Sequence, residues 1–171
     1  MSHLSTKEFK AAKIAVLTVS DTRNEETDTS GGYLAQALQD AGHLLADKKI
    51  VIDDPYKIRA IVSTWIADDN IEAVLITGGT GFTSRDTTPE AVSVLFDKQV
   101  EGFGELFRHV SYQEIGSSTI QSRAIAGFAN KTVIFCMPGS TGACKTAWTK
   151  IIVEQINSQH KPCNFMPHIG V

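Results

Sequence analysis

Glycine, threonine and charged residues are concentrated in one segment of the sequence, 76–90, which reads I-T-G-G-T-G-F-T-S-R-D-T-T-P-E. Glycines let a main chain approach a ligand closely, and the N–H and hydroxyl groups of such a loop suit phosphate or another anion. The carboxylate of Asp86 could hold a metal ion that accompanies a phosphate, and Arg85 could bind a phosphate through two N–H groups. We interpret the segment as an anion-binding loop, with a tight turn before a capped helix as the alternative.

The elements that position this loop are indicated by apolar runs and by the helical spacing of apolar residues. Near-continuous apolar runs predict buried parallel strands, and apolar residues three or four positions apart predict helices. The predicted strands are 13–20, 44–52, 73–76, 122–128 and 132–137. The predicted helices are 31–41, 55–66, a helix after Pro89, 105–111 and 143–156. Thr29 or Ser30 could cap the first helix, and the glycines of 102–104 are expected to interrupt the helical pattern.

Strands alternate with helices in the first three units, which predicts right-handed crossovers and a mostly parallel sheet. The close pair of strands joined at Asn130 and Lys131 indicates one antiparallel strand. We therefore predict an α/β fold, a three-layer α/β/α sandwich formed by one domain over residues 13–156. Residues 1–12 are expected to be a flexible N-terminal arm, and residues 157–171 a C-terminal tail that packs on the domain.

Polar loops follow several predicted strands at their carboxyl ends, where ligands bind in open α/β sheets. We expect these loops to meet at one edge of the sheet; they contain Ser20-Asp21, Asp53-Asp54, Thr77 to Asp86, and Pro138-Gly139-Ser140. Two alternatives stay open, because Asp53 could be a helix cap and the Pro138 loop could be a simple connection. The acidic residues of 21–28 are expected to form a solvated loop rather than a metal cluster.

Composition narrows the class of protein. The chain has 171 residues, a formal net charge of −3 and an isoelectric point near 5.9, which argues against a broad nucleic-acid-binding face. No window reaches the roughly 18 apolar residues that a membrane span requires, and the N-terminus lacks the apolar core of a signal peptide. The three cysteines, Cys136, Cys144 and Cys163, form no C-x-x-C pair, so we expect no disulfide framework and a cytoplasmic location.

Several motifs together resemble the signature of the molybdopterin-binding family. Within that family, the chain is similar to the Mog-type adenylyltransferases. The first part of the signature is Thr77 to Gly81 followed by Ser84-Arg85-Asp86 and Thr88 to Ala91. The later motifs occur in the same order and are Gly102 to Glu105, Ser122-Arg123, and Pro138 to Ser140. The resemblance extends from about residue 13 to residue 155 and thus covers nearly the whole chain.

This resemblance implies binding of molybdopterin and its adenylylation by Mg-ATP, in a homotrimer or homohexamer that could contact other molybdenum cofactor synthesis proteins. It implies that Asp53 and Asp86 are the catalytic residues and hold Mg²⁺. It implies substrate or nucleotide binding by Ser20, Asp21, Thr77, Gly78, Gly79, Thr80, Gly81, Arg85, Glu105, Arg123, Pro138, Gly139 and Ser140. Two alternatives are a molybdopterin-binding or scaffold protein without catalysis, and a Mg-dependent enzyme that acts on another nucleotide.

Overall fold

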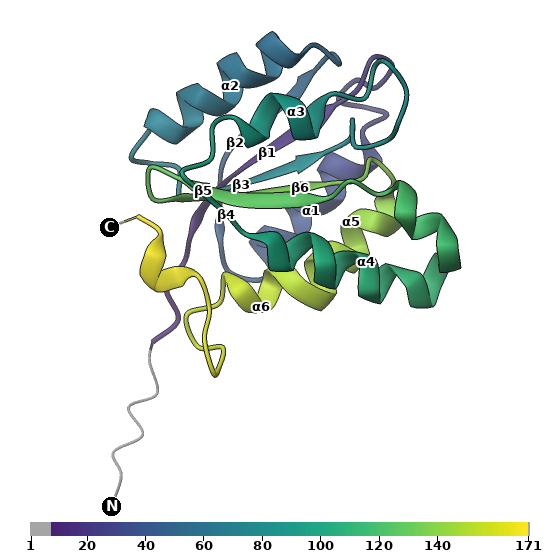
Figure 1. The fold of residues 1–171 in the computed structure, drawn as a ribbon. Coiled ribbons are helices and arrows are strands. Elements are labelled where there is room, and N and C mark those ends of the chain that lie inside the picture. Colours follow the sequence, from purple (N-terminus) through teal and green to yellow (C-terminus); the bar gives the residue numbers. More distant parts are fainter. Residues whose placement is uncertain (1–7, 171) are drawn as a thin grey trace, which may run out of the picture.

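A six-stranded sheet forms the centre of the structure, a computed structural model in which residues 8–170 are described (Figure 1). The strands are β1 (Lys13–Val19), β2 (Leu44–Val51), β3 (Ala73–Thr77), β4 (Lys98–Gln99), β5 (Ile125–Ala129) and β6 (Thr132–Met137). Their order across the sheet is β2-β1-β3-β6-β5-β4. The strands β2, β1, β3 and β6 are parallel, whereas β5 runs antiparallel to both β6 and β4. The predicted sheet, mostly parallel with an antiparallel strand beside Asn130, is confirmed.

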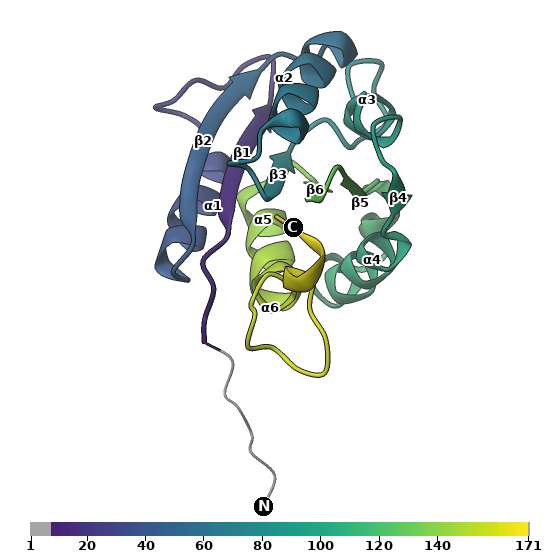
Figure 2. The same ribbon diagram turned by 90° about the vertical axis from the view of Figure 1, so that its left-hand side faces the viewer.

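Helices cover both faces of this sheet and complete the predicted three layers. They are α1 (Thr29–Asp40), α2 (Pro55–Ala67), α3 (Thr88–Ser93), α4 (Glu101–Ile115), α5 (Thr141–Ala147) and α6 (Val153–Gln155). A π-helical turn, Trp148–Ile152, joins α5 to α6, and 3-10 helices occupy Gly116–Gln121 and Met166–His168. Figures 1 and 2 show α2 and α3 on one face, with α1, α4, α5 and α6 on the other. No helix in residues 8–170 is both long and apolar enough to cross a membrane.

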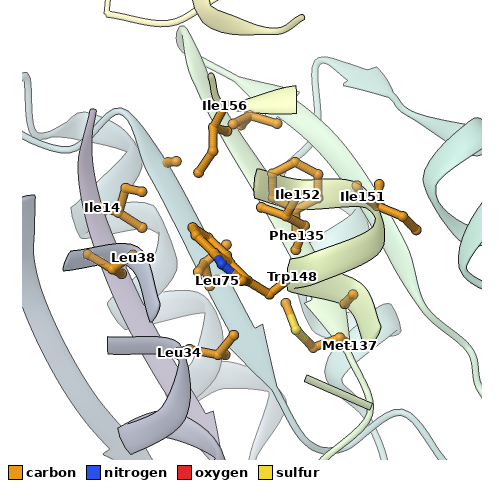
Figure 3. Close-up of a cluster of buried hydrophobic side chains, with 14 of the residues drawn as sticks. Ile14, Leu34, Leu38, Leu75, Phe135, Met137, Trp148, Ile151, Ile152 and Ile156 are labelled. Atoms are coloured by element: carbon orange, nitrogen blue, oxygen red, sulfur yellow. The ribbon is translucent and has the colours of Figure 1, made fainter. Parts of the chain in front are cut away.

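Two hydrophobic clusters hold these layers together, one on each face of the sheet. Successive side chains of a strand point to opposite faces, so Val16 of β1 enters the cluster under α1 and α4, and Leu17 enters the cluster under α2 and α3. Both side chains are fully buried. Figure 3 shows the larger cluster, in which Leu75 of β3 lies beside Trp148. Burial of one such side chain contributes about 1.5–3 kcal/mol to folding.

Three details differ from the predicted elements. Helix α4 begins at Glu101 and continues through the glycines of 102–104, so the predicted interruption is wrong. Helix propensity is a weak preference, and packing on the sheet overrides it here. A Cβ atom on Gly104 would lie 2.5 Å from the carbonyl oxygen of Ala124, so this glycine permits α4 to approach the loop before β5. The first helix is capped by Asp28, not by Thr29 or Ser30, and the short edge strand β4 was not predicted.

The C-terminal segment lies against the amino ends of the strands. Met166 and Ile169 are buried and join the larger hydrophobic cluster, and the N–H of Gly170 donates to the carbonyl oxygen of Lys131 over 3.0 Å. The predicted N-terminal arm falls partly outside the described residues, which begin at residue 8. Within the described part, the N–H of Lys10 donates to Oγ of Ser158 over 2.8 Å, so the segment just before β1 contacts the C-terminal segment.

A buried histidine links the starts of β1 and β2. Nδ1 of His43 accepts a hydrogen bond from the N–H of Ala12 over 3.0 Å, and the ring packs against Phe9 with centroids 5.2 Å apart. Burial lowers the pKa of His43, while the nearby carboxylate of Glu72 acts in the opposite direction. The neutral ring is therefore the form that the fold favours.

We predict that His43 makes the protein less stable as the pH falls through the pKa of about 6.5 that histidine has in unfolded chains. Its pKa is lower in the folded state, so its contribution is complete above that value and is lost below it. The free energy of unfolding, measured in urea at pH 7.5, 6.5 and 5.5, should fall more in the wild type than in His43→Asn, which keeps an acceptor that does not titrate. Equal slopes in both proteins would contradict this assignment.

Candidate functional site

A cleft of about 450 Å³ opens at the carboxyl ends of β1, β3 and β6. The structure brings most of the predicted site residues together here, since the cleft is lined by Ser20, Asp21, Asp53, Thr77, Gly78, Gly79, Thr80, Gly81, Asp86, Pro138 and Gly139. These residues come from four loops that are far apart in the sequence. The predicted meeting of the strand-end loops at one edge of the sheet is confirmed by this geometry.

The loop after β3 is held against its neighbours by a close main-chain contact at Gly78. This residue has φ +102°, and a Cβ atom would lie 2.2 Å from the carbonyl oxygen of Val19. Its N–H donates to the carbonyl oxygen of Met137 over 3.0 Å, which joins the loop to the end of β6. On the other side, a Cβ atom on Gly139 would lie 3.3 Å from Cα of Gly78. Three strand ends can meet here because Gly78 carries no side chain, and the contact at Gly139 leaves little spare room.

The next residues of the loop present unused hydrogen-bond donors to the cleft. Within residues 8–170, the main-chain N–H groups of Gly79, Thr80 and Gly81 donate to no protein acceptor. Successive free N–H groups in a glycine loop form a concave donor surface that suits an anion. The carbonyl oxygen of Gly79 accepts a hydrogen bond from the N–H of Thr88 over 3.0 Å. This bond holds the loop against the start of α3.

Two carboxylates lie beside these donors. Oδ1 of Asp53 is buried and has no hydrogen-bond partner within residues 8–170, and a Cβ atom on Gly79 would lie 3.0 Å from it. Burial raises the pKa of Asp53, and the charges of Asp21 and Asp86 raise it further. Oδ2 of Asp86 accepts from the N–H and the hydroxyl of Thr83, over 2.9 and 2.8 Å, which fixes the orientation of that carboxylate.

These two carboxylates could hold a cation together with a bound phosphate. Among residues 8–170 there is no group of three or more His, Cys, Asp or Glu side chains that could hold a metal ion. Mg²⁺ is commonly held by one or two carboxylates, with phosphate oxygens and water completing its shell. The unpartnered oxygen of Asp53 fits such a ligand, because a buried carboxylate oxygen is costly unless something binds it.

Arg85 is already paired in this structure. Its Nε and Nη2 donate to the two carboxylate oxygens of Asp21, over 2.9 and 3.0 Å. The hydrogen bond from Arg85 lowers the pKa of Asp21, and a second hydrogen bond from the N–H of Asp53 acts in the same direction. Both side chains are exposed at the rim, and Arg85 does not line the cleft. We expected Arg85 to bind a phosphate through two N–H groups, but in this structure those two groups bind the carboxylate of Asp21.

Arg123 supports the glycine loop from behind. Its Nε and Nη2 donate to the carbonyl oxygen of Gly81 over 2.9 and 2.7 Å, and Nη2 donates to the carbonyl oxygen of Asp86 over 3.0 Å. It also pairs with the carboxylate of Glu90, and its guanidinium lies 5.3 Å from the centre of the Phe82 ring. These contacts fix the main chain that carries Asp86.

The other two predicted residues outside the cleft have different surroundings. Oγ of Ser140 caps α5 by accepting from the N–H of Ala143 over 3.1 Å. Glu105 lies on α4 and lines a separate cleft of about 290 Å³ between α4 and β5, together with Arg108. Their predicted contacts with substrate stay predictions.

Several residues that line the cleft were not singled out from the sequence, among them Thr22, Arg23 and Gln121. Arg23 stands in a polar loop where nothing in the residue pattern separates it from other surface cations. Asp28, expected in a solvated loop, is buried and accepts from the hydroxyl of Thr18 over 2.7 Å and from the N–H of Gly31 over 2.9 Å. The signal that could have found it is its position three residues before Gly31, which is typical of a helix cap.

Comparison with known proteins identifies the family. A family model described as a probable molybdopterin binding domain matches residues 15–158. The chain is 59% identical over 169 residues to molybdenum cofactor biosynthesis protein B of Escherichia coli (strain K12), which covers 99% of each chain. The chain belongs to the molybdopterin-binding domain family of molybdenum cofactor biosynthesis proteins. The resemblance seen in the sequence motifs is thereby confirmed.

Solved structures of this family have the same fold. A crystal structure of a molybdenum cofactor biosynthesis protein B superposes with a TM-score of 0.85 at 46% identity, covering 88% of this chain and 94% of that chain. The tungsten cofactor synthesizing protein MoaB from Pyrococcus furiosus superposes with a TM-score of 0.72 at 38% identity, covering 83% and 91%. The sheet order and the glycine-loop cleft described above therefore belong to a molybdopterin-binding domain.

We predict that Gly78→Ala destabilises the protein and disrupts the cleft. The new Cβ would meet the carbonyl oxygen of Val19, and a positive φ is strained for alanine, at a cost of about 1–3 kcal/mol. Gly32→Ala is the control, because a Cβ there meets no atom within 4 Å and alanine favours the helix by about 0.5–1 kcal/mol. Urea unfolding should show opposite signs for the two variants; destabilisation by both, or by neither, would contradict the geometry.

Proposed function

We propose that this protein transfers AMP from Mg-ATP to the phosphate of molybdopterin during molybdenum cofactor synthesis. The observation that carries the proposal is that Asp53, with its unpartnered buried Oδ1, and Asp86 line the same cleft as the free N–H groups of the glycine loop. Anion donors suit a phosphate that is only bound as well as one that reacts, and cation-binding carboxylates beside them are needed where two phosphate groups react.

The chemistry explains why these groups suffice. An oxygen of the molybdopterin phosphate attacks the α-phosphorus of ATP, a P–O bond forms, and the bond to pyrophosphate breaks. Catalysis of such a transfer depends on positioning and on neutralising charge more than on proton transfer. Mg²⁺, when bound, would neutralise phosphate charge, and Asp53 and Asp86 would hold it. The loop N–H groups from Gly79 to Gly81 would orient a phosphate, since they donate to no protein acceptor within residues 8–170.

Contacts around the cleft keep these groups in place. Arg123 fixes the carbonyl oxygens of Gly81 and Asp86, and Thr83 fixes the Asp86 carboxylate. Groups that already stand in their reactive positions lose little entropy and need little rearrangement when substrate binds. We expect the active form to be a homotrimer or homohexamer in the cytoplasm, with molybdopterin and a nucleotide as ligands and other molybdenum cofactor synthesis proteins as partners.

A second candidate is a molybdopterin-binding protein that transfers no AMP. The observation that favours it is the pairing of Arg85 with Asp21, because this pair withdraws one guanidinium from the phosphates. The two candidates share the cleft and differ in whether Asp53 and Asp86 are used for reaction.

We predict that Asp86→Asn abolishes AMP transfer while the affinity for molybdopterin stays within about tenfold of the wild type. Asparagine keeps the oxygen that accepts from Thr83 but removes the charge that holds a cation. The control is Asp69→Asn, because Asp69 lies in a different cleft, beside Asn130 and Lys131. Transfer is measured as labelled AMP appearing on molybdopterin, and binding by titration calorimetry.

Three outcomes of these measurements separate the candidates. A wild type that binds molybdopterin and transfers no AMP with Mg²⁺ and ATP would refute the proposal and leave the binding protein. Full activity in Asp86→Asn would refute the role of that carboxylate. Tight ATP binding with no affinity for molybdopterin would indicate an enzyme that acts on another nucleotide.

A further inference from the structure

One basic residue lines the candidate cleft among the described residues, and it is Arg23. Three aspartates, Asp21, Asp53 and Asp86, line the same cleft, so a phosphate ester that enters it meets more negative than positive charge. Two nearby arginines already form ion pairs with carboxylates of the protein, Arg85 with Asp21 and Arg123 with Glu90. Arg23 forms no ion pair with any carboxylate in residues 8–170.

The guanidinium of Arg23 is held in place through one of its two amino groups. Nη1 donates to the carbonyl oxygen of Thr27 over 2.6 Å and to the hydroxyl of Thr29 over 3.0 Å. Within the described part of the chain, Nε and Nη2 donate to no protein atom. Two donors of one planar fork are therefore free, which is the arrangement that binds two oxygens of a phosphate.

A chain of hydroxyl groups connects this arginine to the opposite wall of the cleft. The hydroxyl of Thr29 lies 2.9 Å from that of Thr141, and Thr141 lies 3.2 Å from the hydroxyl of Ser30. Ser30 donates to the carbonyl oxygen of Gly139 over 2.7 Å. The main chain is also held, because Oγ of Ser20 accepts from the N–H of Arg23 over 3.1 Å. The loop that carries Arg23 is thus fixed to the loop after β6 before any ligand binds.

We infer that Arg23 is the phosphate-recognition residue of this cleft and binds a phosphate ester through its free Nε and Nη2 groups. This inference deepens the proposed function, since the phosphate would be that of molybdopterin or one of the phosphates of ATP. Charge-assisted hydrogen bonds from a guanidinium are among the stronger contacts that a phosphate can receive. The contact also explains how a cleft with three aspartates accepts an anionic substrate.

The test measures binding, independently of AMP transfer, by titration calorimetry with paired ligands. The pairs are Mg-ATP against adenosine, and molybdopterin against its dephosphorylated form. Arg23→Gln should weaken binding of at least one phosphate-bearing ligand about tenfold or more and leave its phosphate-free counterpart within about twofold. Arg23→Lys should recover part of the loss, since it keeps the charge and loses the fork. Lys57→Gln, on the exposed side of α2, removes a positive charge outside the cleft. It should change the affinity neither for the phosphate-bearing ligands nor for their phosphate-free counterparts.

The outcomes separate the two sources of phosphate and the possible failures. Loss confined to molybdopterin assigns its phosphate to Arg23, and loss confined to Mg-ATP assigns a nucleotide phosphate. Equal weakening of a phosphate-bearing ligand and its phosphate-free counterpart would show a merely structural role and overturn the inference. No weakening, or a wild type without preference for phosphate-bearing ligands, would overturn it as well. If Arg23→Gln selectively weakens binding of a phosphate-bearing ligand and the wild type transfers no AMP, the inference is supported and the proposed function fails.

Discussion

The close contact of main chains at Gly78 is the constraint on which the rest of the site depends. At this point the carbonyl oxygen of Val19 lies too near for any side chain on Gly78, and a Cβ atom on Gly139 would lie 3.3 Å from Cα of Gly78. The ends of β1, β3 and β6 can therefore meet, and the free N–H groups of Gly79 to Gly81 lie beside the carboxylates of the neighbouring loops. A larger residue at position 78 would push the walls of the cleft apart.

The stability of the fold and the chemistry of the site make opposite demands on the same residues. A buried carboxylate oxygen without a partner, as in Asp53, destabilises a folded protein unless a ligand binds it. The surrounding fold tolerates this cost because fully buried strands and helices supply hydrophobic stabilisation on both faces of the sheet. The rest of the loop is held by hydrogen bonds from Arg123, from Thr83 and from the N–H of Thr88. The buried hydroxyl oxygens of Thr87 and Thr88, beside the cleft, also have no hydrogen-bond partner within residues 8–170.

The arginines show how one residue type takes three roles within a single site. Arg123 binds carbonyl oxygens and supports the loop, and Arg85 neutralises Asp21 at the rim. Arg23 lines the cleft, and its Nε and Nη2 donate to no atom of residues 8–170. The guanidinium group permits all three, since its donors can be divided between main-chain oxygens, carboxylates and a ligand. Which role each arginine takes depends on the acceptors within reach, and those acceptors come from distant parts of the chain.

The fold class, the parallel order of the first three units and the glycine loop could all be predicted from the residues alone, because apolar periodicity and glycine spacing are local properties. It also placed Asp53 and Asp86 after strands whose carboxyl ends share one edge. Three features could be read only from the folded chain: Asp28 is buried, the glycines of 102–104 continue a helix, and Arg85 faces Asp21 rather than the cleft. These outcomes depend on contacts between residues up to 64 positions apart, as in the Arg85–Asp21 pair, and no local pattern encodes such a distance in space.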